Sequence, residues 1–209
     1  MTGRRAFVVA ERAALSDTFA ERGPAQPTLC RGWQTRDLLR HLVLREAGPV
    51  RRLLAGAAVR GREAGWTELI QQFRAGPPPG SLFRLPGADT AANLEEFFVH
   101  HEDVRRATPG WTRRELPVEV EDAIWRRLSS PLGRIAVRRA GVGVHIRRGG
   151  TRQADAEHTT LRAARPGVII TGPPSEILIF LFGRQCAAVV DLQGPAEARD
   201  RLAHATLGF

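Results

Sequence analysis

The amino-acid sequence predicts an α+β fold, with a helical unit over residues 1–133 followed by a small α/β unit over residues 134–209. Two observations carry this prediction. Apolar residues recur with a helical period through most of the first unit, and beyond it the pattern changes to short, nearly alternating segments typical of strands. A chain of 209 residues with 43% hydrophobic residues is long enough to bury a core in each unit.

Glycine and proline residues, which interrupt helices, mark the expected helix ends in the first unit. Thr35 is a suitable N-cap for one of them, with Asp37 in its first turn. We expect that helix to end at Gly48-Pro49, and we expect the Pro-rich segment 76–80 to be a loop. The expected helices span residues 4–21, 35–47, 50–59, 66–73, 90–107 and 118–128.

The second unit is expected to alternate strands and helices. Residues 134–139 and 142–148 flank Gly141 and predict a strand pair. Ser175 is the expected N-cap of a helix over residues 176–182. The remaining predicted strands are residues 158–164, 168–171 and 187–192, and a last amphipathic helix is predicted over residues 195–205.

The chain is basic, and every basic residue is arginine: 31 Arg face 22 acidic residues, for a net charge of +9. The excess is shared by both halves of the chain. No aromatic residues for base stacking and no nucleic-acid-binding motif accompany the densest group of arginines. We therefore favour a solvated surface or a small-anion site over a nucleic-acid platform for this group, Arg134, Arg138, Arg139, Arg147, Arg148 and Arg152.

Two cysteines, Cys30 and Cys186, are too few for a disulfide framework. We interpret Cys30 as a packing residue, and Cys186, which precedes an apolar segment, as a core residue. The sequence contains no apolar run of membrane-spanning length and no signal-peptide pattern, so we expect a cytoplasmic protein with no membrane partner. The oligomeric state is left open.

The densest group of potential metal ligands lies between residues 95 and 103. On a helix, Glu96 and His100 share one face at i, i+4, and Asp103 continues that face. A carboxylate and an imidazole in this arrangement suit a divalent cation. His101 lies about 100° around the helix. Its place on an apolar stripe makes His41 the best candidate for a third ligand, because a buried imidazole needs a partner.

The spacing alone leaves alternatives open. A carboxylate and a histidine one turn apart also form ordinary surface ion pairs. His41 would be equally satisfied by Glu96 or Asp103 without any cation. Asp103 would serve either to orient a ligand histidine or to pair with Arg40 or Arg106.

Two segments resemble a known family. Residues 30–42 resemble the signature C-x-G-W-[ST]-x-x-D-L-x-x-H-L of the DinB-like, mycothiol-dependent maleylpyruvate isomerase superfamily, and residues 96–103 resemble its later E-x-x-x-H-R-x-D helix. Residues 168–184 resemble the sterol-carrier-like α/β domain that often follows the bundle. Gln34 departs from the signature where Ser or Thr is usual, and His101 departs where Arg is usual.

The resemblance implies an N-terminal DinB-like four-helix bundle in which His41, Glu96 and His100 bind a divalent metal. Zinc is the usual metal of the family, and two histidines and a glutamate also suit Ni²⁺ or Fe²⁺. His101 is left as an alternative or auxiliary ligand. Trp33 is interpreted as a packing anchor of the bundle.

The resulting hypothesis is a metal-dependent thiol transferase or isomerase, in which the metal activates the thiolate of mycothiol toward an electrophilic or anionic small molecule. Arginines of the 134–152 segment are candidates for holding substrate carboxylates. The alternative is a metal-binding protein without catalysis. A less favoured alternative is nucleic-acid binding through the Arg-rich hairpin.

Overall fold

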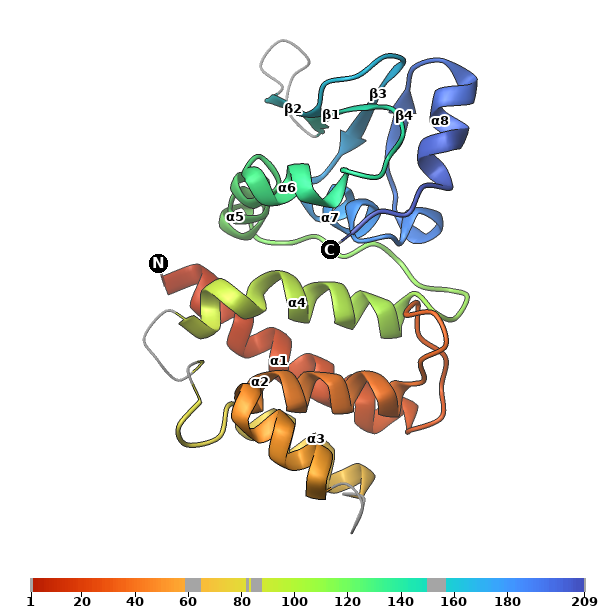
Figure 1. Cartoon of the computed structure of the whole chain (residues 1–209). Coiled ribbons are helices and arrows are strands. Elements are labelled where there is room, and N and C mark those ends of the chain that lie inside the picture. Colours follow the sequence, from red (N-terminus) through yellow and green to blue (C-terminus); the bar gives the residue numbers. More distant parts are fainter. Residues whose placement is uncertain (1, 59–64, 82, 84–87, 150–156, 209) are drawn as a thin grey trace. The chain divides into compact units, whose positions relative to one another are not determined.

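A computed structural model describes residues 2–58, 65–81, 83, 88–149 and 157–208. The chain is mixed helix and sheet and divides into two compact units, Met1–Trp111 and Thr112–Phe209 (Figure 1). None of the helices in the described ranges has the length and apolar character needed to cross a membrane.

The first unit is mainly helical over its described residues, with an isolated β-bridge between Pro27 and Gln34 in the loop before the second helix. Its helices are α1 (Thr2–Arg22), α2 (Thr35–Ala58), α3 (Trp66–Ala75) and α4 (Ala88–Arg105). Helix α1 packs against α4 and α3, and α3 packs in turn against α2 (Figure 1). Aromatic edges meet in the core, where the ring centroids of Phe73 and Phe97 lie 5.3 Å apart at 83°.

The second unit is built on a four-stranded sheet. Its strands are β1 (Gly143–Arg148), β2 (His158–Arg162), β3 (Gly167–Gly172) and β4 (Asp191–Gln193), in the order β2-β1-β3-β4. β1 pairs parallel with β3, and the two outer pairings are antiparallel. The side chains of β3 alternate between buried and half-buried, so one face of the sheet is covered by protein and the other is more open.

Helices cover the buried face of this sheet. α5 (Val118–Leu128), α6 (Pro131–Ala136) and α7 (Pro174–Leu181) lie on one side of it, and α8 (Ala196–Ala203) contacts β3 (Figure 1). Every residue of α7 is buried. In the apolar run Ile177–Phe182, the five residues that belong to α7 are therefore core, and Phe182, at its C-cap, is half-buried.

Helix α2 is longer than expected. We expected it to end at Gly48-Pro49 and a separate helix to follow, but one helix continues to Ala58. A proline inside a helix loses one backbone hydrogen bond, yet its fixed φ is compatible with helical geometry. Gly48-Pro49 therefore does not end α2, because the residues on both sides of it are helical.

The predicted strand at residues 134–139 is wrong, because the segment belongs to α6 and the turn after it. Ser130 caps α6 by accepting a hydrogen bond from the backbone N–H of Leu132, and Pro131 occupies the first helical position. This Ser-Pro start signal outweighs the alternating pattern of the residues that follow, so residues 134–139 do not pair with β1; the described antiparallel partner of β1 is β2.

Two smaller predictions in the second unit also differ. Ser175 lies inside α7 rather than capping it, and its hydroxyl donates to Glu121 Oε1 at 2.7 Å. Pro174 takes the first helical position instead. β4 is limited to residues 191–193, because residues 185–187 form a 3-10 turn.

The two units divide earlier than the expected boundary near residue 133. Helix α5, which we assigned to the first unit, packs against α7 in the second. Its buried face explains the difference, since Val120, Ile124 and Leu128 need an apolar partner and α7 supplies one.

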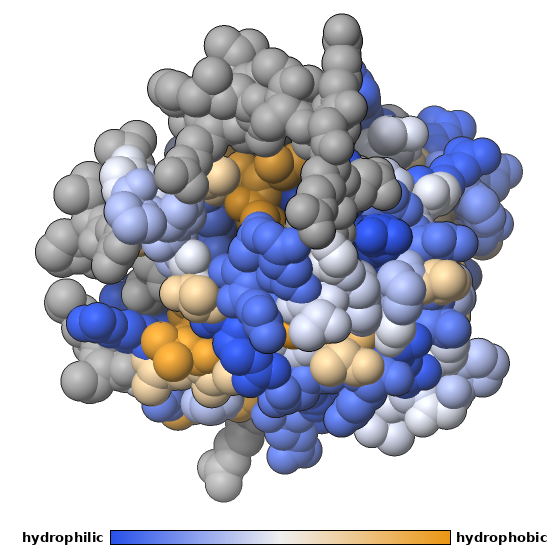
Figure 2. Space-filling view, turned by 90° about the horizontal axis from the view of Figure 1, so that it is seen from below, coloured by the Kyte–Doolittle hydropathy of each residue, from blue (hydrophilic) through white to orange (hydrophobic). Residues whose placement is uncertain are grey.

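The surface shown in Figure 2 is mostly hydrophilic, and the hydrophobic residues coloured there form small, separate patches. Single exposed apolar side chains of this kind are ordinary on soluble surfaces.

Candidate metal centre

His41, Glu96 and His100 come together in the first unit, although the two helices that carry them are distant in sequence. His41 lies on α2, and Glu96 and His100 lie one turn apart on α4. Each offers one ligand atom, and the three atoms lie within 4.8 Å of one another. Leu38 and Leu42, beside His41 on α2, are fully buried and fix this face of the helix against the core.

Three side-chain nitrogens converge on Glu96 Oε1. This oxygen lies 3.1 Å from His41 Nε2, 3.3 Å from His100 Nε2 and 3.3 Å from Arg45 Nε. Burial opposes ionisation of Glu96, but hydrogen bonds from His100 and His41 outweigh burial and hold the pKa of this carboxyl well below its usual range. The carboxylate is therefore charged, as a metal ligand must be.

His100 is held from both sides of its ring. Nε2 faces Glu96, and Nδ1 lies 2.8 Å from Oδ2 of Asp103, whose side chain is 0% exposed. Burial favours the neutral ring, but hydrogen bonds to Asp103, Cys30 and Glu96 raise the pKa of His100 well above its ordinary value. Of the two roles left open for Asp103, the structure shows the contact that orients His100.

Cys30 approaches the same histidine from a turn. Trp33 N–H donates to the carbonyl of Cys30 at 2.9 Å, and Gly32, two residues after the cysteine, has φ = 78°. A type II turn requires such a positive φ at its third residue, which is why glycine stands there. Cys30 Sγ lies 3.1 Å from Asp103 Oδ2. Packing alone does not describe this cysteine, because its thiol is part of a polar cluster.

The candidate metal centre, which consists of His41, Glu96 and His100, is most exposed to solvent at the histidine on α2. The side chain of His41 is 31% exposed, whereas that of His100 is 12% exposed. Trp33, interpreted from the sequence as a packing anchor, is 38% exposed, and its ring centroid lies 5.3 Å from that of His41. The tryptophan thus flanks the accessible side of the histidine.

A chain of polar contacts connects Glu96 to the core. Arg45, on the ligand carboxylate, also donates to Asn93 Oδ1, and Asn93 donates to Glu46 Oε1 at 2.9 Å. The carboxylate of Glu46 accepts hydrogen bonds from the two terminal nitrogens of Arg12, Nη1 and Nη2, each at 2.6 Å. Glu46 and Asn93 are buried, so each contact satisfies a group that has left water.

His101 lies elsewhere. It is buried between α4 and α1, with Nδ1 2.9 Å from Glu11 Oε1 and Nε2 2.9 Å from Thr18 Oγ1. Both ring nitrogens are therefore in contacts with α1 and face away from His41 and Glu96. The structure gives His101 the role of a core histidine that joins two helices, so it is not an auxiliary ligand.

The other predicted residues are spread over the second unit. His158 and His204 are exposed, and Cys186 is exposed rather than buried in a core. Its short 3-10 turn places it on the surface, which its apolar neighbours in sequence did not indicate. Of the arginine group, Arg148 contacts Asp122 and Glu157, and Arg152 lies outside the described residues.

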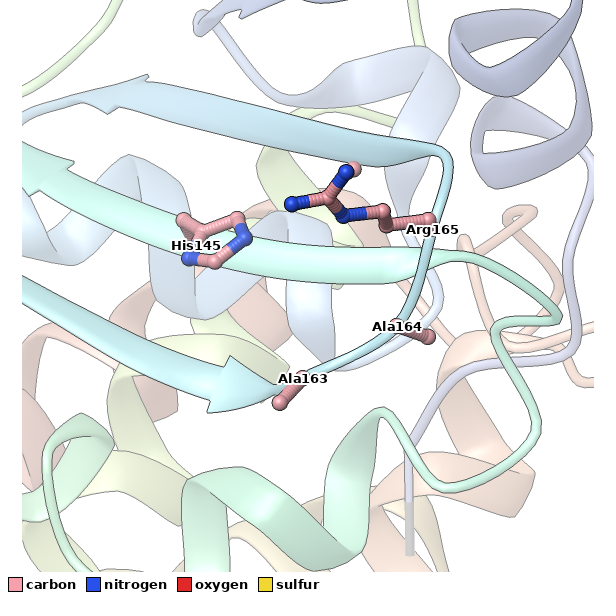
Figure 3. A pocket seen from close by; sticks show the side chains of 5 residues that line it. His145, Ala163, Ala164 and Arg165 are labelled. Carbon is pink, nitrogen blue, oxygen red and sulfur yellow. The ribbon is translucent and has the colours of Figure 1, made fainter.

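A hollow of about 530 Å³ lies on the open face of the sheet, lined by His145, Ala163, Ala164, Arg165 and Gly167. Figure 3 shows His145 on β1 and Arg165 between β2 and β3, on the same face of the sheet. Nδ1 of His145 is 3.0 Å from Thr160 Oγ1. Among the described residues, both groupings suited to a metal ion lie in the first unit, so this hollow is not a metal site of that kind.

Comparison with protein-family models, with curated proteins and with solved structures finds no match to this chain. Function is therefore inferred from the geometry of His41, Glu96 and His100. Its donor set fits a divalent cation: two imidazole nitrogens and one ionised carboxylate oxygen converge on one point, and one imidazole is oriented by a buried carboxylate. In proteins generally, three-ligand zinc sites of two histidines and a glutamate keep an open coordination position, whereas closed structural sites have four protein ligands.

Proposed function

We propose that this protein binds one divalent cation, Zn²⁺ in preference to Ni²⁺ or Fe²⁺, through His41, Glu96 and His100, and that it is a metal-dependent thiol transferase or isomerase. The convergence of the three ligand atoms within 4.8 Å carries the proposal. The sequence resemblance to the DinB-like, mycothiol-dependent maleylpyruvate isomerase superfamily supports the choice of thiol chemistry.

The residues around the centre have separable tasks. Asp103 Oδ2 accepts the Nδ1 proton of His100 and so directs the Nε2 lone pair toward the cation. Arg45 holds Glu96 in place through Nε. Trp33 and the exposed edge of His41 form the side from which a small molecule reaches the centre.

Three protein ligands leave a coordination position for an external thiol. The bound cation would supply one thing, the deprotonation of that thiol near neutral pH. We infer that the thiol is a low-molecular-weight cosubstrate of the mycothiol type, and that its acceptor is a small electrophile. The protein would then act in the cytoplasm, where such thiols are kept reduced.

The proposal extends to the fold. The four helices of the first unit would form a DinB-like bundle, and the sheet and helices of the second would correspond to a sterol-carrier-like domain. The supporting observations are the helical content of the first unit and the α+β content of the second.

Metal content by elemental analysis tests the site. We expect about one Zn²⁺ per chain in the wild type and a large loss in His41→Ala, Glu96→Ala and His100→Ala. His204→Ala, at an exposed histidine of the second unit, is the matched control and should retain the metal. Unchanged metal content in all three site variants would refute the assignment.

Activity is tested on protein that has passed this first test. The metal-loaded chain is mixed with mycothiol and a model electrophile, and thiol consumption is followed. Turnover above that of His41→Ala supports the enzyme. Turnover equal to that variant, with metal bound, would instead identify a metal-binding protein without catalysis.

A further inference from the structure

A second trio of ligand atoms lies beside the first one. Cys30, His100 and Asp103 bring a sulfur, a nitrogen and an oxygen within 4.8 Å of one another. The proposed function does not use the cysteine, and its position is not accidental: the backbone N–H of Leu29 donates to the carbonyl of Asp103 at 3.0 Å, which ties the loop before Cys30 to the end of α4.

The distances between these three ligand atoms are close to those found around a bound metal ion. Sγ is 3.1 Å from Asp103 Oδ2 and 3.9 Å from His100 Nδ1, and Nδ1 is 2.8 Å from Oδ2. Metal bonds of about 2.3 Å to sulfur and about 2.0–2.2 Å to nitrogen and oxygen give ligand–ligand distances of roughly 3–4 Å in a tetrahedral site. To close around an ion, the trio needs the two distances to Asp103 Oδ2, 2.8 Å and 3.1 Å, to lengthen by roughly half an ångström.

His100 belongs to both trios, through different nitrogens. In the first, Nδ1 keeps its proton on Asp103 and Nε2 faces the cation. In the second, Nε2 would keep its proton, which Glu96 Oε1 accepts at 3.3 Å, and Nδ1 would offer its lone pair. A neutral imidazole has one lone pair, so it serves one ion at a time.

We propose that Cys30, His100 and Asp103 form a second cation site, which contains a thiolate, takes soft divalent cations such as Cd²⁺, and shares His100 with the site of His41 and Glu96. Binding replaces the Sγ–H and Nδ1–H protons by bonds to the cation, and both protons leave to solvent if the ring starts as the imidazolium. The site requires neither His41 nor Glu96, so it stands independently of the proposed function.

The chemistry of the donors favours a soft cation here. Thiolate sulfur selects soft metals, whereas the first trio, with two imidazoles and a carboxylate, does not discriminate in this way. Asp103 adds a fully buried negative charge, and Cys30 is half-buried. Two anionic ligands and one neutral ligand balance a divalent charge inside the protein.

The test is a Cd²⁺ titration of the full chain in a non-thiol reductant, followed by the ultraviolet thiolate-to-cadmium charge-transfer band. We expect the band to saturate at one equivalent in the wild type. Cys30→Ser should abolish it, and Cys186→Ser should leave it unchanged, because Cys186 is the exposed second cysteine. Asp103→Asn should weaken Cd²⁺ binding by at least about tenfold.

Two further measurements make the result decisive. Circular dichroism of Cys30→Ser establishes that the variant is folded, and His41→Ala should keep the band because the thiolate site does not contain His41. A wild-type chain without the band, or a Cys30→Ser variant that retains it, would overturn the proposal. Loss of the band in His41→Ala would also overturn it, since Cys30 would then belong to the first site. Failure of the proposed function would appear separately, as zinc content that His41→Ala leaves unchanged in a Cys30→Ser background, where the second site cannot hold the ion.

Discussion

Replacing Asp103 with asparagine removes one negative charge from behind a proposed metal ligand without changing the size of the side chain. Asp103 Oδ2 lies 2.8 Å from His100 Nδ1, and its side chain is 0% exposed. A hydrogen bond to a charged group contributes about 1.5–3 kcal/mol. Loss of a partner that orients a metal-bound histidine typically lowers metal affinity about 10–100-fold, or about 1.4–2.7 kcal/mol. The two estimates agree.

The assay is competition of the purified chain with a chromophoric zinc chelator, at a pH where wild-type binding is saturable. We expect the dissociation constant for Zn²⁺ to rise about 10–100-fold in Asp103→Asn. His41→Ala should bind more weakly still, because it removes a ligand itself.

The matched control is Asp17→Asn, which makes the same chemical change on α1. Asp17 is exposed and pairs with Arg74, and an exposed ion pair contributes about 0–1 kcal/mol to stability. Zinc affinity should not change in this variant. If Asp103→Asn binds zinc as tightly as Asp17→Asn, then the carboxylate does not orient His100 and the reasoning from geometry is wrong.

Three other results are expected. The raised pKa of His100 means that a proton must leave before zinc binds, so zinc affinity should fall about tenfold per pH unit below that pKa. The same shift affects the stability of the metal-free protein. His100 contributes its full stabilisation below its ordinary pKa of 6.5, and this contribution is lost as pH rises through the raised pKa. Glu46→Gln should lower the free energy of unfolding by about 3–5 kcal/mol in denaturant titration, because it removes the charge from the buried carboxylate that both terminal nitrogens of Arg12 contact. Gly133→Ala should cost stability by thermal melting, because a Cβ there would lie 1.9 Å from the Leu128 carbonyl oxygen.

Each of these results has a contrary outcome. Zinc affinity independent of pH between 5 and 8 would mean that His100 is neutral in the metal-free protein. A Glu46→Gln variant within about 1 kcal/mol of the wild type would show that Arg12 finds another partner or reaches water. For Gly133, a melting temperature equal to that of the wild type would contradict the tight packing between α5 and α6.

The sequence predicted a helix well where a proline or glycine at its end adjoined a clear helical period of apolar residues. Helix α5 spans the predicted residues 118–128 because Pro117 starts it and its apolar face is strongly periodic. The same logic misplaced the end of α2, since Pro49 weakens a helix without dictating where it stops. Residues 134–139 were misassigned because alternation over six residues is a weak signal beside a Ser-Pro helix start.

The ligand trio could be suggested from sequence because two of its members lie one turn apart on a strong helix. His41 required a tertiary argument, and an unpaired histidine on an apolar stripe supplied it. His101 could not be assigned, because its partner Glu11 is separated from it by 90 residues. The thiol of Cys30 was missed for the same reason: only the fold brings it 3.1 Å from a buried carboxylate.

His41 and Glu96 are separated by 55 residues, and they meet only in the folded first unit. An ion held by both would therefore be a removable cross-link between α2 and α4. Closing a loop of this length in the unfolded chain costs about 4 kcal/mol when a disulfide does it. The folding stability of such a protein would depend on the concentration of available metal, and a chelator would weaken the packing of α2 against α4 whether or not the protein is an enzyme.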